Sequence, residues 1–240
     1  FNGNVTNFKA MGNTIHDSNN IGIDIIGFEG VGPQGLDQAR NGIIADNVVF
    51  NISTRDNPAY QEYTAAGIYV DGGRDLIIER NRIFNCDIGV ELACEHSGGV
   101  TSRVIVRDNV AWRNSIGGIL LGGYDRRRGA TEACIITNNT FFENDTQRFE
   151  IGEVNIRYRA NNNIFTNNIF YAGAQGYLIT FPREFADSVG NSFDGNGYFT
   201  SGRTAGWEWE GRWISSFSGF QSISGQGNGG IYTNPQFVSK

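Results

Sequence analysis

The sequence repeats one short pattern: an Asn-containing turn, an apolar alternation, a second Asn four or five residues later, and a Gly that leads another alternation. The first asparagine series is Asn13, Asn47, Asn81, Asn109, Asn139 and Asn168, and the second is Asn51, Asn85, Asn114 and Asn144. A unit that recurs every 20 to 50 residues or so cannot bury its own apolar face and must stack on its neighbours. The pattern therefore predicts a solenoid.

Four Gly-led segments can be aligned one below another at 22–26, 67–71, 89–93 and 118–122, and residues 153–157 offer a fifth segment that begins with Glu153. Period two places their apolar residues on one face, which we expect to be the core. The opposite face carries two rows of side chains. The first row is Asp24, Tyr69, Glu91, Leu120 and Asn155, and the second is Ile26, Asp71, Ala93, Gly122 and Arg157.

These alternations predict an all-β protein, specifically a right-handed parallel β-helix with asparagine ladders and loop insertions. Its handedness rests on the crossover rule for parallel strands. Residues 1–190 are expected to form the coils, and residues 191–240, where the repeat fades, a C-terminal cap of the same domain. The segment Trp207–Glu210 could instead be an aromatic platform for a glycan.

Composition excludes several classes of function. The 240 residues carry a net charge of −6, which gives no electrostatic basis for binding nucleic acid or an anionic membrane. The sequence contains no apolar run of about 18 residues, so we expect no membrane span. Cys86, Cys94 and Cys134 match no zinc spacing and are interpreted as buried small hydrophobes. His16 and His96 are the only histidines, so no metal triad is expected.

The segments between the repeats predict where function resides. Residues 27–45, 52–66, 96–103 and 123–132 are longer than a minimal coil requires and have loop-like compositions. Loops on a rigid scaffold often carry binding and catalytic residues.

Three carboxylates, Asp71, Glu91 and Glu95, are predicted to lie together on neighbouring coils, with Asp71 diagonal to both glutamates. Like charges so close should separate their pKa values, leaving one acid protonated and another ionised. Hydrolysis of a glycosidic bond needs one such acid and one such carboxylate. The spacing of stacked strands is compatible with both retaining and inverting geometry, and solvated acids on a β-face are the simpler alternative.

Several neighbours are candidates for substrate binding: Tyr69, His96, Tyr124, Asp125 and Arg157. Gly122 and Gly123 would leave a floor without side chains beside the acids, on which a sugar ring could lie. Trp112 is expected either in the core or as a stacking surface. Three consecutive arginines, 126–128, could grip a uronate carboxylate or simply be solvated on a loop.

These features resemble the pectate-lyase-like superfamily of right-handed β-helix proteins. The resemblance is carried by the segments Val70–Gly73, Ile78–Asn81, Asp87–Glu91, Glu95–His96, Gly117–Gly118, Gly122–Asp125 and Asn138–Thr140. Within that superfamily, an Asp-Gly-Gly followed by a Glu about one coil later is similar to glycoside hydrolase family 120, the retaining β-xylosidases. That resemblance implies Asp71 as nucleophile and Glu95 as acid/base, with Glu91 as the rival.

The function expected is hydrolysis of a plant-type oligo- or polysaccharide, without a cofactor. A polysaccharide lyase is the second hypothesis. Because the only lysines are Lys9 and Lys240, one of Arg74, Arg80, Arg107 or Arg157 would have to act, with calcium as a cofactor. A non-catalytic glycan-binding β-helix is the third.

Two expectations concern the setting of the protein. An exposed first coil would be an edge open to strand pairing, so a homo-oligomer or a missing N-terminal portion is expected. Secretion, or location in a periplasm, is expected from the class of protein alone.

Overall fold

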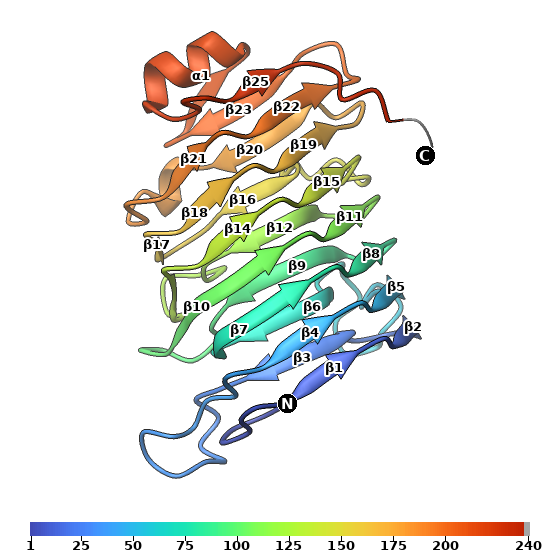
Figure 1. The fold of residues 1–240 in the computed structure, drawn as a ribbon, viewed down its shortest axis with the longest axis vertical. Coiled ribbons are helices and arrows are strands. Elements are labelled where there is room, and N and C mark those ends of the chain that lie inside the picture. The colour runs from blue at the N-terminus through green and yellow to red at the C-terminus, as the bar shows by residue number, and fades with distance from the viewer. Residues whose placement is uncertain (238–240) are drawn as a thin grey trace.

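The computed structural model describes residues 1–237, which wind into a parallel β-helix (Figure 1). Each coil contributes one strand to each of three sheets, and strands of successive coils pair in parallel. The predicted right-handed parallel β-helix is confirmed. The asparagine turns and period-two alternation explain it, since every strand buries one face inside the coil.

The first sheet joins β1 (Lys9–Met11), β4 (Ile43–Ala45), β7 (Arg74–Glu79), β10 (Val100–Arg107), β14 (Ile135–Thr137), β18 (Ile164–Thr166) and β21 (Ser192–Asp194); β13 (Ala130–Glu132) pairs with β10, and β17 (Ala160–Asn161) pairs with β13. The second joins β2 (Thr14–Ser18), β5 (Val48–Ile52), β8 (Arg82–Phe84), β11 (Val110–Trp112), β15 (Thr140–Phe142), β19 (Ile169–Ala172), β22 (Gly197–Thr200) and β25 (Ile231–Tyr232). The third, here called the groove sheet, joins in parallel β3 (Ile23–Ile26), β6 (Ala66–Asp71), β9 (Ile88–Ala93), β12 (Gly117–Leu121), β16 (Val154–Ile156), β20 (Tyr177–Phe181) and β23 (Gly206–Trp209), and β24 (Arg212–Ile214) pairs antiparallel at its end.

The first asparagine series forms a continuous ladder between the first and second sheets, which is exposed at Asn13 and buried from Asn47 onward. In a typical rung, the Asn109 backbone N–H and side-chain amide donate to Asn139 Oδ1 at 3.0 and 2.9 Å, and Asn139 repeats both bonds to Asn168. The Asn139 amide also donates to Val106 O at 2.8 Å. Each side chain therefore satisfies buried backbone groups at a turn, where strand pairing cannot reach them. The ladder continues to Asn196, one coil beyond the predicted series.

The second predicted series combines two different columns, which is a correction. Asn114 and Asn144 form a buried ladder whose next rung toward the N-terminus is Cys86, whose backbone N–H donates to Asn114. Asn51 and Asn85 lie one position earlier, exposed and in the left-handed region at φ 54° and 52°. Both roles suit asparagine, so residue type alone did not distinguish the two columns.

A third ladder was not predicted. It links the Cys134 backbone N–H to Asn163 and Asn163 to Asn191 at the corner that precedes the first-sheet strands. Only two asparagines form it, which is too few to produce a visible repeat.

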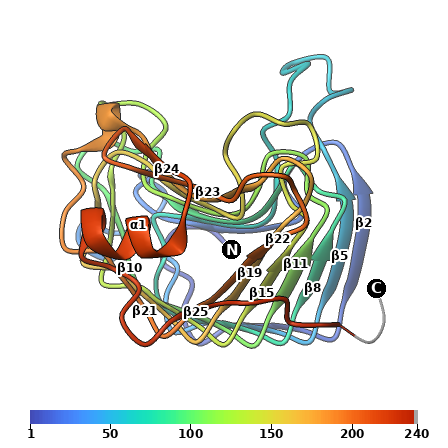
Figure 2. The same ribbon diagram turned by 90° about the horizontal axis from the view of Figure 1, so that it is seen from above.

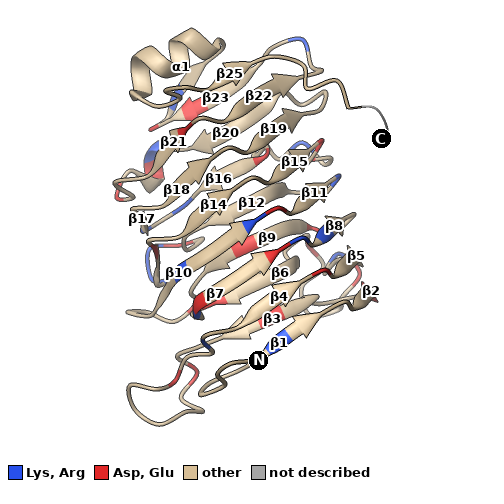
Figure 3. Cartoon of the chain, in the orientation of Figure 1, with Lys and Arg blue, Asp and Glu red and all other residues tan. Residues whose placement is uncertain are grey.

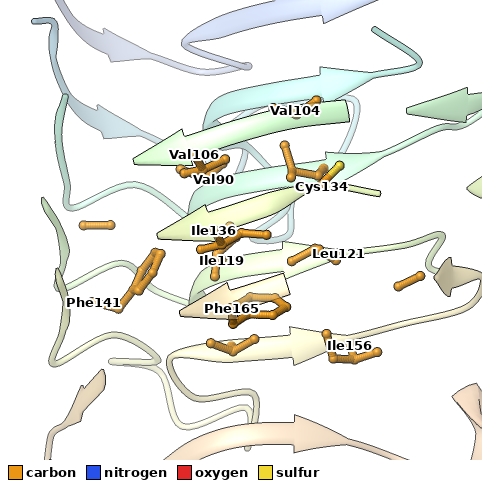
Figure 4. Close-up of a cluster of buried hydrophobic side chains, with 14 of the residues drawn as sticks. Val90, Val104, Val106, Ile119, Leu121, Cys134, Ile136, Phe141, Ile156 and Phe165 are labelled. Atoms are coloured by element: carbon orange, nitrogen blue, oxygen red, sulfur yellow. The ribbon is translucent and has the colours of Figure 1, made fainter. Parts of the chain in front are cut away.

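The core fills the interior of the coils. Figure 4 shows side chains from successive coils stacked on one another, including Val90 above Ile119 and Val104 near Cys134. The alternation predicted for the Gly-led strands holds, since Ile68, Val90 and Ile119 are fully buried. All three cysteines are buried and free, as predicted.

The C-terminal boundary at residue 190 needs correction. Strands β21, β22 and β23 continue the three sheets, so the coils extend to residue 209. The cap consists of β24, antiparallel to β23, and α1 (Phe217–Ser224). Phe220 of α1 is fully buried and stacks on Trp207 with ring centroids 5.6 Å apart. Trp207 and Trp209 are buried, so the cap explains them better than an exposed platform.

Trp112 is not in the core and lines a cavity of about 340 Å³ together with Val110 and Phe142, so the alternative of a stacking surface stays a prediction. It lies on the outer face of the second sheet and stacks on Phe84 at 4.3 Å, in a partly exposed column with Phe50 and His16. Ala111 takes the inward position in that strand. Within residues 1–237, no helix is long and apolar enough to cross a membrane.

Candidate functional site

Strand register places one row of side chains along the groove sheet, as predicted for its first five members. Pairing aligns Asp24 with Tyr69, Tyr69 with Glu91, Glu91 with Leu120, and Leu120 with Asn155. The same row continues beyond the prediction through Thr180, Glu208 and Trp213. The full row, from Asp24 to Trp213, is called the groove row below.

Loops cover part of this face, which makes the site deeper than the sequence suggested. Residues 53–65 project from the end of the coil (Figure 2) and are anchored by Asp87, whose carboxylate accepts from the N–H groups of Thr64 and Ala65. Asp145 anchors a second loop by accepting from the N–H groups of Phe149 and Ile151. Beneath them lies a small apolar cluster: Ala66, Tyr69, Ile88, Ala93 and Leu120, with Ile21, Ile116 and Ile151 packed against it.

A groove runs along these coils. One cavity of about 470 Å³ is lined by Glu91, Glu95 and Tyr69, and a second of about 580 Å³ extends to Trp213. Tyr124 and Arg157 line both cavities, so the two are contiguous at these residues. A third cavity of about 460 Å³ opens beside Arg157, toward the 53–65 loop. Together these cavities form a concave site large enough for several sugar rings.

Glu95 presents a partly exposed carboxylate to the groove. Its side chain is 40% exposed. The hydroxyl groups of Tyr69 and Tyr124 donate to its two oxygens at 3.4 and 3.5 Å, and Arg128 approaches at 3.3 Å. Burial raises the pKa of both tyrosines, Tyr69 well above its usual value, so both hydroxyls keep the protons that they donate. Glu95 is thus surrounded by three hydrogen-bond donors at the edge of the groove.

Glu91 is the buried carboxyl of the groove. Its side chain is 8% exposed, and Arg157 donates to it at 3.1 Å. Burial raises the pKa of Glu91 to about 7, the Arg157 charge opposes that rise, and the charges of Glu95 and Asp71 add to it. Asn155 holds the guanidinium by accepting from Arg157 Nε at 2.9 Å. Glu91 therefore exchanges its proton near neutrality, as a general acid requires.

Asp71 lies behind Glu95 and is not among the residues that line the cavities. Its Oδ1 accepts the Glu95 backbone N–H at 2.6 Å. Burial raises the pKa of Asp71 to about 6, although that N–H bond lowers it. Farther along, burial and the charge of Asp71 raise the pKa of Asp24 to about 7. The pKa values of Asp24, Asp71 and Glu91 are thus all raised, and the predicted separation into a protonated and an ionised acid stays a prediction. The sequence analysis did not single out Asp24 as an acid of the site.

The remaining predicted residues divide between groove and scaffold. Tyr124 and Arg157 line the groove. His96 instead approaches Glu29 at 3.5 Å, and so lies near a carboxylate outside the groove. Asp125 organises its own turn by accepting from the Arg127 N–H at 2.7 Å, and this bond lowers the pKa of Asp125.

The predicted glycine floor is not open, which is a correction. A Cβ on Gly122 would meet Tyr158 O at 2.5 Å, because Gly123 and Tyr158 form an antiparallel bridge there. Arg128, from the three-arginine run, lies over the Tyr124 ring at 4.4 Å and pairs with Glu95. That arginine therefore positions groove residues and does not project freely from a loop tip.

Sequence reasoning missed the distal part of the groove. Tyr177, Glu208 and Trp213 line it but lie in coils where the predicted repeat fades. Extending the strand alignment by two coils would have placed Glu208 in the groove row. Trp213 had no comparable signal, because its strand pairs antiparallel. Across residues 1–237, no three His, Cys, Asp or Glu side chains lie so that they could hold a metal ion.

Comparison with known proteins identifies relatives. The family described as "Right handed beta helix region" matches residues 1–141. The chain is 37% identical over 238 residues to the uncharacterized protein YwoF of Bacillus subtilis (strain 168). The aligned region covers 98% of this chain and 50% of YwoF. It therefore spans about half the length of this curated relative.

Among solved structures, an alginate lyase from Paenibacillus sp. str. FPU-7 superposes with a TM-score of 0.50 at 13% identity, over 78% of this chain and 66% of the lyase. At that identity the likeness concerns the fold alone. The family match and this likeness confirm the predicted resemblance to pectate-lyase-like β-helix proteins. The finer resemblance to glycoside hydrolase family 120 stays a prediction.

Proposed function

The chain belongs to the family of right-handed β-helix proteins, and from this premise we propose that it is a glycoside hydrolase acting on a neutral glycan in the groove. Because this fold hosts several activities, the proposal rests on the site. One observation carries it: two glutamates with different environments, Glu91 and Glu95, face the same cavity. A buried acid and a stabilised carboxylate are the pair that glycoside hydrolysis needs.

The charge of the groove favours a neutral substrate. Its cavities are lined by Glu62, Glu91, Glu95, Glu150, Glu184 and Glu208, against Arg55 and Arg157. Figure 3 marks acidic positions on β9 and β23, which carry Glu91 and Glu208. Such a surface repels a polyuronate, whereas carboxylates accept hydrogen bonds from the hydroxyl groups of neutral sugars.

The environments of the two glutamates assign their roles. Glu91 donates its proton to the glycosidic oxygen as the bond to the anomeric carbon breaks, and the leaving sugar departs as an alcohol. Glu95 either attacks the anomeric carbon or removes a proton from an attacking water. In the first case, water gives a proton to Glu91, attacks the anomeric carbon and breaks the bond between that carbon and Glu95. In the second case, the water oxygen bonds to the anomeric carbon, Glu95 releases the proton it took to solvent, and Glu91 regains a proton from solvent. Asp71 acts in neither step and positions Glu95 through its backbone N–H.

The proposal is tested by replacing each acid with its amide and measuring sugar release from neutral oligosaccharides and aryl glycosides. We expect Glu91→Gln and Glu95→Gln each to reduce kcat by about 10²–10⁴-fold, since each removes proton transfer or the carboxylate that acts on the anomeric carbon. Glu132→Gln, on β13 in another sheet, is the matched control. Unchanged turnover in both groove variants would contradict the proposal. Glycan binding without turnover in the wild type would favour a binding module.

A lyase is the second candidate, and one observation favours it. Arg157 lies at the junction of the cavities together with Tyr124, and Tyr69 lines the adjoining cavity. Arginine can hold a uronate carboxylate, and a protonated tyrosine can give its proton to the departing sugar oxygen. Incubation with uronate polymers, monitored by ultraviolet absorption of unsaturated products, tests this candidate. Product that survives Glu91→Gln and is lost in Arg157→Lys would replace hydrolysis by elimination.

A further inference from the structure

We propose that Trp213, with Tyr177, forms a second glycan subsite at the C-terminal end of the groove, so that the protein binds a neutral chain several sugars long. This inference rests on the proposed function, because it assumes that the groove holds a glycan. It adds a binding site on the cap, remote from the acids.

Strand register fixes the relation of the two sites. Starting from Glu91, the groove row passes Leu120, Asn155, Thr180 and Glu208 before it reaches Trp213. These are five strand spacings of about 4.8 Å, or about 24 Å along the axis of the solenoid. The contiguous cavities connect both ends. A bound chain that reaches both must therefore run parallel to the solenoid axis and exceed a disaccharide.

The indole of Trp213 is held in position before any ligand arrives. It lies over the backbone of Gly206, where an added Cβ would come within 1.9 Å of the ring. Its ring packs beside Tyr177 at a centroid distance of 4.9 Å and an interplanar angle of 58°. Two aromatic rings so constrained lose little conformational freedom when a sugar stacks on them.

Exposure separates Trp213 from the other tryptophans of this segment. Trp207 and Trp209, on β23 of the last coil, are buried beneath the cap, whereas Trp213 on β24 is 50% exposed. The cap therefore does not need the open face of its indole for packing. Large aromatic side chains exposed in a cavity are typical of ligand sites, where an apolar surface meets a few directed polar groups.

The polar groups around Trp213 are carboxylates. Glu150, Glu184 and Glu208 line the same cavity, with Arg157 at its far side. Carboxylates beside an aromatic ring suit a neutral sugar, which offers C–H groups to the ring and hydroxyl donors to the acids. A uronate at this position would face like charge.

The test measures binding, and it uses the full chain with Glu95→Gln to prevent turnover. Titration calorimetry compares xylobiose, xylohexaose and cellohexaose, with and without Trp213→Ala. Of xylohexaose and cellohexaose, the one that binds the protein more tightly should lose about tenfold in affinity on Trp213→Ala. The affinity for xylobiose should change by less than about twofold. Trp112→Ala, on the outer face of the second sheet, should change neither. Thermal unfolding of both variants checks that the fold is retained.

The outcomes separate this inference from the proposed hydrolysis. Equal loss of affinity for the short and long ligands, or no loss for either, would overturn the distal subsite even if sugar release by the wild type had established the hydrolase. Failure of all three neutral ligands to bind would overturn it as well. Length-dependent binding through Trp213 in a protein without hydrolytic activity would support the subsite and reject the enzyme.

Discussion

At the scale of single residues, the groove gives similar carboxyl groups different properties. Glu91 lies in β9, and Glu95 lies two residues after the end of that strand. Glu91 is nevertheless buried beside Arg157, whereas Glu95 is partly exposed among three hydrogen-bond donors. Burial, more than the identity of the residue, raises the pKa of Glu91.

Asp24 offers a test of this burial through pH. Because its pKa is about 7 when folded and 3.8 by reference, the folded state holds its proton more tightly. The resulting stabilisation is complete below about pH 4 and is lost as pH rises to about 7, amounting to at most about 4 kcal/mol. We expect Asp24→Asn to flatten the fall in unfolding free energy between pH 4 and 7, measured by urea denaturation. Asp56→Asn, at an exposed position of the 53–65 loop, is the control. An equal fall of the unfolding free energy with pH in the wild type and in both variants would contradict this account.

Sequence predicted the cluster of acids but not their surroundings. Alternation in the Gly-led strands was sufficient to align Tyr69 with Glu91 and to place Asp71 diagonal to both glutamates. It could not show that Asp71 lies behind the Glu95 backbone, because that depends on how the chain turns after β9. Nor could it show that Ile116 and Ile151 cover Leu120, since these contacts join loops of different coils.

At the scale of the secondary-structure element, asparagine ladders determine how turns stack. Asn139 is nearly fully buried and exchanges hydrogen bonds with the coils on both sides, whereas its neighbour Asn138 is exposed in the left-handed region. The two positions are adjacent in sequence and have opposite requirements. One needs the amide group, and the other needs only a residue that accepts a positive φ.

This difference predicts unequal costs. Asn139→Ala removes the acceptor of two Asn109 donors and the donor to Val106 O, and we expect it to lower the free energy of unfolding by about 2–4 kcal/mol. Asn138→Gly should be neutral or slightly stabilising, since glycine adopts φ 56° without steric cost. Chemical denaturation measures both. Similar losses in the two variants would show that the ladder contributes no specific stability.

At the scale of the whole molecule, the solenoid is a stack in which each coil contacts its neighbours, so its ends decide where unfolding begins. The C-terminal end is closed by α1 and β24 over the last coil. Phe220 is the buried contact of that helix, packed against Trp207 and Trp209.

Weakening this cap should therefore have a graded effect. We expect Phe220→Ala to cost about 3–5 kcal/mol and to increase amide exchange most in β23, less in β20, and least in β9. Hydrogen exchange followed by mass spectrometry measures the gradient. Ile223→Ala, at an exposed position of the same helix, should leave exchange unchanged. A uniform increase across all coils would show that the molecule opens as one unit.

The groove row gives the molecule a property of a ruler. Its graduations are strand spacings of about 4.8 Å: four of them are steps between coils, from Glu91 to Glu208, and the last is the antiparallel step from Glu208 to Trp213. Insertion of a whole coil between β12 and β16 would keep every ladder in phase and move the tryptophan one graduation away from the acids. The preferred length of the bound chain would then change by a fixed step, because the distance is built from units that cannot be divided.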